Sequence, residues 1–154
     1  NFPFNYLPGK IAWVIGASMI IPKHVFDKVK GFDEDYFLYG EDEDICLRIR
    51  KEGYAVGYYP EVKVVHFDGA SERKNSWYDI TTKKQTALSQ FYQKHYSCDA
   101  IRLLLKRDLR RAHRRVTINK IRLTFKLRPS QQKYDTYRAI FDSSKSFLNK
   151  LNED

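Results

Sequence analysis

The sequence predicts an α/β fold for residues 1–98 and a helical extension for residues 99–154. An almost continuous apolar run at residues 11–22 is typical of a buried strand. Residues 55–59 and 63–67 are rich in β-branched and aromatic side chains, which is typical of short strands. Between and after these segments, apolar residues recur at steps of three and four, as in helices. Strands mixed with helices, followed by helices alone, indicate this fold class.

The first half contains two helices with recognisable ends. Pro22 closes the apolar run and can begin a short helix, and Gly31 can end that helix in a left-handed conformation. A second helix is expected to follow Gly40 and to stop at Gly53. Its buried stripe would consist of Ile45, Cys46 and Ile49.

The second half predicts helices at residues 76–96, 99–116 and about 131–151. Residues 116–128 fit two patterns, because apolar and polar residues alternate strictly while Ile118, Ile121 and Phe125 also fit a helix. We favour the helix, since no turn and partner strand follow.

Composition excludes several classes of protein. An apolar content of 42% with 15% aromatic residues predicts a folded core rather than disorder. Cys46 and Cys98 are too few and too far apart for a disulfide framework or a zinc site, so we expect reduced thiols in a cytoplasmic protein. No segment approaches the roughly 20 apolar residues that cross a bilayer.

The net charge of +9 is concentrated in one segment. Residues 1–98 contain 13 Lys/Arg and 13 Asp/Glu, residues 99–128 contain 11 and 2, and residues 129–154 contain 4 and 4. A neutral region followed by a basic segment predicts two units, the second with an anionic partner.

Four consecutive carboxylates begin the helix expected after Gly40, namely Glu41, Asp42, Glu43 and Asp44. The helix dipole stabilises acids in a first turn by about 0.3 to 1 kcal/mol each. An i,i+4 ion pair between Asp44 and Arg48 would add about 0.2 to 0.5 kcal/mol. These effects explain much of the cluster without catalysis.

Helix geometry nevertheless indicates that at least one of the four acids does not face solvent. Successive helical residues are about 100° apart, so four consecutive acids cannot all face solvent while Ile45 and Ile49 are buried. At least one carboxylate should point into an adjoining cleft. Phe37, Leu38 and Tyr39 would make that cleft partly apolar, which raises a carboxylate pKa and suits a general base. His66, at the end of a predicted strand, is by itself a structural residue as readily as a ligand.

Four motifs occur together in order: WVIGASMIIP at 13–22, GFDEDYFLYGEDEDICLR at 31–48, GY at 53–54 and YPEVKVVHFDGAS at 59–71. This set resembles the C-terminal half of a bacterial family 2 glycosyltransferase, similar to the rhamnosyltransferase-like members, over residues 11–97. The resemblance implies a partial GT-A fold with a mixed sheet. It also implies inverting transfer from a nucleotide-diphospho-sugar to a saccharide or lipid-linked acceptor, in bacterial cell-surface polysaccharide synthesis.

The resemblance also implies roles for individual residues. Asp42 corresponds to the general base, with Glu41 beside it and Asp44 as the following acid. His66 corresponds to a ligand of a divalent cation, Mg²⁺ or Mn²⁺, that stabilises the leaving diphosphate. Asp33 and Glu34 could shape the acceptor side or form a polar turn. The residues expected beside the donor or acceptor are Trp13, Gly16, Ala17, Ser18, Ser71 and Arg73.

Two of these assignments have plain alternatives. Residues 13–18 could serve core packing, which we favour over direct ligand contact. The loop Gly69, Ala70, Ser71 and Arg73 could close over the diphosphate or remain solvated. In the family an N-terminal βαβ half ends in an Asp-x-Asp metal motif, and this sequence has no such half before its first predicted strand. We therefore expect a fragment that is inactive alone.

The helix at 99–116 pairs a leucine stripe with a basic face. Such a helix can bind the inner face of the plasma membrane through Arg107, Arg110, Arg111, Arg114 and Arg115. Alternatively, Leu104, Leu105 and Leu109 pack it on the domain. A non-catalytic module that binds nucleic acid is less favoured, because aromatic residues for stacking are absent from residues 99–115. A catalytically dead fragment whose extension mediates protein assembly is a further alternative.

Overall fold

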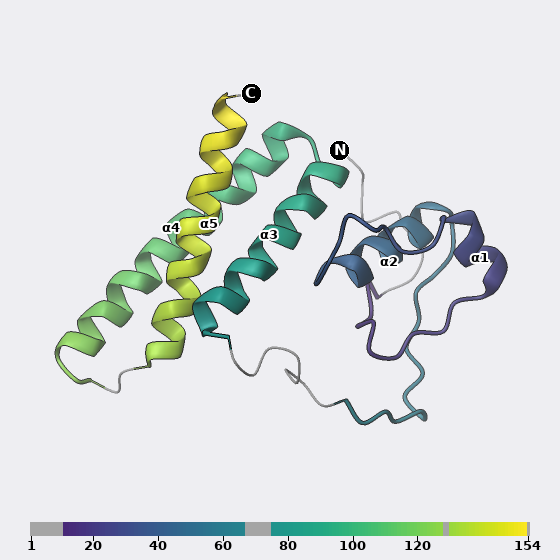
Figure 1. The fold of residues 1–154 in the computed structure, drawn as a ribbon, viewed down its shortest axis with the longest axis horizontal. Helices are drawn as coiled ribbons and strands as arrows, with labels where there is room; N and C mark the ends of the chain where they lie inside the picture. The colour runs from purple at the N-terminus through teal and green to yellow at the C-terminus, as the bar shows by residue number, and fades with distance from the viewer. Residues whose placement is uncertain (1–10, 67–74, 128–129, 154) are drawn as a thin grey trace. The chain divides into compact units, whose positions relative to one another are not determined.

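A computed structural model describes residues 11–66, 75–127 and 130–153 of the chain. The chain divides into two compact units, residues 2–70 and 71–154. This division lies well before the domain boundary at residue 98 that we predicted. The helix after residue 76, which we placed in the first domain, is part of the second unit (Figure 1).

The first unit contains helices α1, Lys23–Lys28, and α2, Glu41–Lys51 (Figure 1). Helix α1 begins after Pro22, as predicted, and the Gly31 amide donates a hydrogen bond to the Phe26 carbonyl just beyond its end. Helix α2 begins after Gly40 and ends before Gly53, and both glycines have a positive φ. The predicted boundaries of both helices are therefore confirmed.

Helices α1 and α2 form the core of the first unit. The side chains that it buries are Val25, Val29, Ile45, Cys46 and Ile49. Apolar residues of the flanking segments pack around this core, including Val14 and Ile21 before α1 and Tyr54 and Val56 after α2. The predicted stripe of α2 is confirmed.

The described residues contain no strand. Residues 11–21 and 54–66 include the segments that we predicted as strands, but they are irregular, with turns at 16–18 and 60–61, and no ladder of hydrogen bonds forms within the described residues. Ile15 is 62% exposed and Ile20 is 97% exposed, so the prediction of a buried strand at 11–22 is wrong for these side chains. The predicted mixed sheet is not seen in this part of the chain.

The second unit consists of helices α3, Trp77–His95, α4, Cys98–Thr124, and α5, Gln131–Glu153. Residues 116–124 continue α4, which confirms the helix that we favoured there. A serine precedes each helix and accepts a hydrogen bond from a first-turn amide: Ser76 from Asp79, Ser97 from Ala100 and Ser130 from Lys133. Such caps satisfy amides that have no partner inside the helix.

Helix α5 packs against both α3 and α4 (Figure 1). The core between α4 and α5 consists of Ile101, Leu105, Phe147 and Leu151. An Arg102 guanidinium N–H donates to the Leu151 carbonyl at 2.8 Å, and the Tyr78 hydroxyl donates to the Asp142 carboxylate at 2.9 Å. None of the helices in the described residues has the length and apolar character needed to cross a bilayer.

Candidate active site

The four acids of the predicted first turn do occupy the first turn of α2. Gly40 has a φ of 86° and Tyr39 a φ of 68°, so two consecutive residues are left-handed just before the helix. Glycine adopts this conformation without strain, whereas for an L-residue it costs roughly 1–2 kcal/mol. The backbone thus makes a sharp turn directly before the acidic residues.

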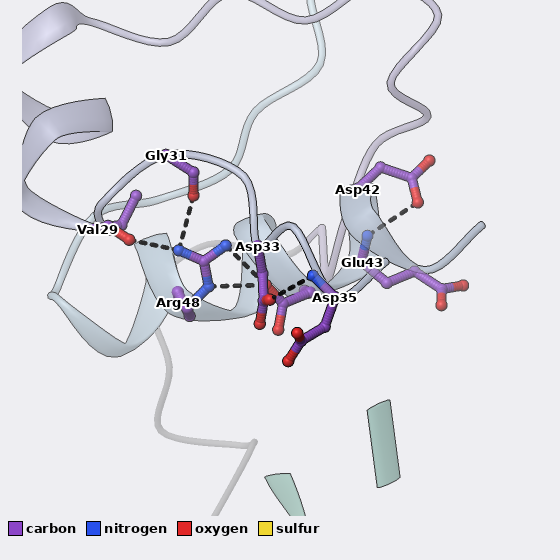
Figure 2. Close-up of polar contacts among 8 residues, drawn as sticks. Val29, Gly31, Asp33, Asp35, Asp42, Glu43 and Arg48 are labelled. Atoms are coloured by element: carbon purple, nitrogen blue, oxygen red, sulfur yellow. Dashed lines mark hydrogen bonds and ion pairs between the residues drawn. The ribbon is translucent and has the colours of Figure 1, made fainter. Parts of the chain in front are cut away.

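Asp44 has a structural partner. Its carboxylate is 1% exposed and lies 2.7 Å from the Arg48 guanidinium, which confirms the predicted i,i+4 pair. The same guanidinium donates hydrogen bonds to the carbonyl oxygens of Val29 and Gly31, at the end of α1 (Figure 2). Asp44 and Arg48 therefore hold the two helices together, and the structure gives Asp44 a positioning contact.

The Asp42 carboxylate is held by two backbone amides. Its Oδ2 accepts a hydrogen bond from the Gly16 N–H at 3.0 Å, and its Oδ1 accepts one from the Glu43 N–H at 2.9 Å. Figure 2 shows Asp42 at the opposite end of the acidic turn from the Arg48 guanidinium. The half-buried carboxylate is thus fixed in orientation without being neutralised by that cation.

Glu43 is the acid whose proton affinity changes most clearly. Burial raises the pKa of Glu43 above its usual range, and the nearby charges of Asp42 and Glu41 raise the pKa further. We expected an apolar wall that includes Phe37, but the Phe37 side chain is fully exposed, so that part of the prediction is wrong. Desolvation by the fold itself, rather than by Phe37, produces the effect.

One carboxylate oxygen of Glu41 can accept a hydrogen bond that the described residues do not supply. Its Oε2 is buried and accepts no hydrogen bond from the described part of the chain. Buried polar atoms are normally paired, and each exception calls for a partner. From the sequence we expected Glu41 to lie beside the base. The sequence does not reveal that its buried Oε2 has no hydrogen-bond partner among the described residues, or that the pKa of Glu43 is raised. Both features depend on the surroundings of α2 rather than on helix periodicity.

A large groove lies along the segments of the same unit that precede α1 and follow α2. Its volume is about 1140 Å³, and it brings together four predicted site residues, Trp13, Ala17, Ser18 and His66. Gly16 lies between two groove-lining neighbours in the sequence and donates the hydrogen bond to Asp42. The base is therefore attached directly to the segment that forms one wall of the groove.

Three tyrosines form an aromatic part of this groove. Tyr54, Tyr58 and Tyr59 line it along with the predicted residues. Tyr58 and Tyr59 are 69% and 65% exposed. Tyr54 and Tyr59 belong to motifs that carry the resemblance, and Tyr58 to a predicted strand, but we assigned none of the three a role in the site. The sequence offered one signal of their proximity to the site, because Tyr58 and Tyr59 directly precede Pro60 in the segment that contains His66.

Three other predictions have different outcomes. Asp33 accepts a hydrogen bond from the Asp35 amide at 3.1 Å, which is the polar turn that we named as its alternative role, and Glu34 is exposed. Gly69, Ala70, Ser71 and Arg73 lie outside the described residues. The described residues contain no group of three His, Cys, Asp or Glu side chains that could hold a metal ion, and His66 is exposed.

The basic residues of α4 other than the half-buried Arg102 are exposed, whereas its apolar stripe is used for packing. Ile101 and Leu105 are buried against α5, and Leu104 and Leu109 are half-buried. This is the packed arrangement that we gave as the alternative to a membrane-bound leucine stripe. The exposed cations are Arg107, Arg110, Arg111, Arg114 and Arg115.

Comparison with curated proteins identifies similar sequences over part of the chain. The chain is 37% identical over 57 residues to "Rhamnosyltransferase WbbL" of Escherichia coli strain K12, which is 37% of this chain and 22% of that protein. It is 38% identical over 56 residues to "N-acetylglucosaminyl-diphospho-decaprenol L-rhamnosyltransferase" of Mycobacterium tuberculosis strain H37Rv, covering 36% and 18%. It is also 29% identical over 76 residues to "O-antigen biosynthesis protein RfbC" of Myxococcus xanthus, covering 48% and 6%.

The chain thus matches about a fifth of the length of each rhamnosyltransferase. No solved structure matches it. The family described as "Glycosyl transferase family group 2" matches residues 3–131, which is more than half of the chain. The resemblance seen in the sequence is confirmed, and the chain belongs to glycosyl transferase family group 2.

Proposed function

We propose that the protein to which these residues belong transfers a sugar from a nucleotide-diphospho-sugar to an acceptor hydroxyl, with inversion, and that Asp42 is the general base. Family membership supports sugar transfer. The observation that carries the finer proposal is the Asp42 carboxylate, bonded to the amides of Gly16 and Glu43 beside a groove lined by Trp13 and His66.

In the proposed step, the acceptor oxygen attacks the anomeric carbon on the face opposite the nucleotide. The bond from that carbon to the diphosphate oxygen breaks, and its electron pair leaves with the nucleoside diphosphate. The acceptor proton moves to an Asp42 oxygen. A carboxylate already oriented by two amides loses little freedom in this step, which favours proton transfer.

The other acids have separate proposed roles. Glu41 offers a buried oxygen that accepts no hydrogen bond from the described residues, which suits an acceptor hydroxyl next to the base. Asp44 is proposed to position α2 through Arg48 rather than to touch the substrate. Glu43 holds its proton to higher pH than an ordinary glutamate and so adds less negative charge beside Asp42.

The names of the relatives favour particular substrates. Two of them are rhamnosyltransferases, which supports an L-rhamnosyl or related hexosyl donor. The name of one specifies a diphospho-decaprenol-linked saccharide, which supports a lipid-linked acceptor, and another is an O-antigen biosynthesis protein. We therefore propose a role in cell-surface polysaccharide synthesis. Ser71 and Arg73 remain predicted contacts of the donor diphosphate.

A divalent cation is proposed for the whole protein, with His66 as one ligand. The described residues do not supply a complete ligand set, so no step is derived through the metal. If His66 is a ligand, His66→Ala should raise the Mg²⁺ or Mn²⁺ concentration that gives half-maximal transfer. An unchanged metal titration would leave His66 as a groove residue only.

We also propose that residues 11–21 and 54–66 join a mixed sheet, as the GT-A fold requires, in the complete protein. Their β-type sequences support this, and so does the share of each relative that the chain matches. The 154-residue chain alone should then show no transfer. Measurable turnover by that chain would contradict this part of the proposal.

The test of the function is to incubate the full-length protein with a nucleotide-diphospho-L-rhamnose and a diphospho-polyprenol-linked N-acetylglucosamine. We expect release of nucleoside diphosphate in step with formation of a glycoside whose anomeric configuration, read by NMR, is opposite to that of the donor. Retained configuration, or donor hydrolysis without a glycoside, would contradict the proposal.

A further inference from the structure

The last turns of α4 leave the packed core of the helical unit. The buried residues of α4 are Ile101, Leu105, Ala112 and Asn119, which recur at steps of four and seven and therefore lie on one face. After Asn119 no residue up to Leu127 is fully buried. The α4 tip, which we define as residues 118–127, lies far from the α3–α4 connection (Figure 1).

The α4 tip exposes large apolar side chains. Ile118, Ile121, Phe125 and Leu127 are 39%, 50%, 68% and 61% exposed. The three residues within or next to the helix are spaced at three and four residues, so they share one side. A cluster of this kind, rather than a single exposed apolar residue, marks an interaction surface.

The same side of α4 changes character along its length. Helical spacing places a single outward row along α4 from Arg107 onward, and its members in order are Arg107, Arg110, Arg114, Ile118, Ile121 and Phe125. The middle of the row is cationic and its end is apolar. All three arginines are exposed, so the row presents charge and apolar surface to one partner.

The surroundings of the tip are strongly basic. Between Asp108 and Asp135 the sequence contains nine Lys/Arg and no Asp or Glu. Lys120, Arg122 and Lys126 alternate with the apolar residues of the tip, and all three are exposed. No acidic side chain of this segment reduces their attraction for an anionic partner.

We propose that the α4 tip binds the surface of a membrane that contains anionic phospholipids. Ile121, Phe125 and their apolar neighbours enter the interface between headgroups and acyl chains. The tip cations contact the phosphate groups, and Arg107, Arg110 and Arg114 extend the basic surface along α4. An anionic membrane surface provides both an apolar layer of acyl chains for the apolar side chains and negatively charged headgroups for the cations.

Nucleic acid satisfies the charge, but Phe125 is the only residue of the exposed apolar cluster with a flat ring on which a base could stack. Branched aliphatic side chains such as Ile118 and Ile121 provide no flat surface on which bases can stack, and single-strand binding depends on such stacking. The exposed aliphatic cluster therefore favours lipid. The inference does not depend on the proposed sugar transfer, because no residue of the first unit takes part in it.

The first test is co-sedimentation of the 154-residue chain with phosphatidylcholine vesicles that do or do not contain about one third phosphatidylglycerol. We expect binding only to the anionic vesicles. The double variant Ile121→Ser, Phe125→Ser should lower the affinity about tenfold or more, because its apolar contacts with the interface are lost. Leu103→Ser, also 68% exposed but at the other end of α4, should bind like the unmodified chain.

Each other result of this test contradicts the proposal. Unchanged vesicle binding by the double variant would show that the tip is not the contact. Salt-dependent retention of DNA without vesicle binding would replace the membrane with nucleic acid. Circular dichroism melting curves of the variants establish that the helices persist, and these solvent-exposed substitutions should leave the curves unchanged.

A second test reports insertion directly. In Phe125→Trp, the difference spectrum against the unmodified chain should shift to shorter wavelength with anionic vesicles, because the indole enters an apolar environment. Inorganic phosphate at the same phosphate concentration should cause no shift. An equal shift with inorganic phosphate, or no shift with vesicles that bind the protein, would overturn the assignment.

Discussion

Two ion pairs, one in each compact unit, differ sharply in burial. In the first, Asp44 is 1% exposed, and Arg48 joins it to two carbonyl oxygens of another segment. In the second, the acid of the Asp99–Arg102 pair is 95% exposed. The Asp44–Arg48 pair is therefore a buried link between two helices of the first unit, whereas Asp99 of the second unit remains in contact with solvent.

The largest stability effect should come from breaking the internal pair. Asp44→Ala leaves the Arg48 guanidinium with its carbonyl partners but without a counterion, and it should lower the free energy of unfolding of the first unit by about 3 kcal/mol. Urea denaturation of the 154-residue chain measures this change. A loss below about 1 kcal/mol would mean that the pair is no more structural than an exposed one.

The next effect concerns the turn before α2. Gly40→Ala forces an L-residue into a φ of 86° and should cost about 1 to 2 kcal/mol. Gly57→Ala is the matched control, because a Cβ there meets no atom within 4 Å and the backbone has no positive φ in the left-handed range. Equal unfolding midpoints for the two variants would show that the left-handed turn is not a constraint.

The raised pKa of Glu43 predicts the direction in which the stability of the fold changes with pH. Its pKa is raised in the folded state, so the folded chain binds more protons than the unfolded chain above the ordinary value of 4.5. Its contribution to stability is therefore present near pH 4.5 and is lost as the pH rises through the raised pKa. Glu43→Gln should remove this loss. Parallel curves of stability against pH for both proteins would contradict the assignment.

The smallest effect is expected in the second unit. Asp99→Ala removes an ion pair whose acid is almost fully exposed, and exposed pairs contribute about 0 to 1 kcal/mol. The melting temperature should therefore hardly change. A loss as large as that of Asp44→Ala would remove the contrast between the two units.

Local signals in the sequence predicted much of this molecule. Gly40, Gly53 and Ser76 indicate helix ends through conformations and hydrogen bonds of adjacent residues, and all three occur as predicted. The i,i+4 pair of Asp44 with Arg48 was also predicted, since both residues lie on one helix.

Contacts between distant segments could not be predicted in this way. The bonds from Arg48 to Val29 and Gly31, and the bond from Gly16 to Asp42, depend on how separate segments pack. Strand patterns at residues 11–22 and 54–66 state a preference for extended backbone, but a sheet also needs a neighbouring strand. The same reason explains why Phe37 was expected in a cleft and is instead exposed.

The most direct test of the central claim is the turnover of Asp42→Asn in the full-length protein. If Asp42 is the general base, kcat should fall by about 10²- to 10⁴-fold while donor affinity, measured by calorimetry, stays the same. Asp35→Asn, an exposed acid in the preceding turn, is the control and should retain its activity. Near-normal turnover of folded Asp42→Asn would contradict the claim.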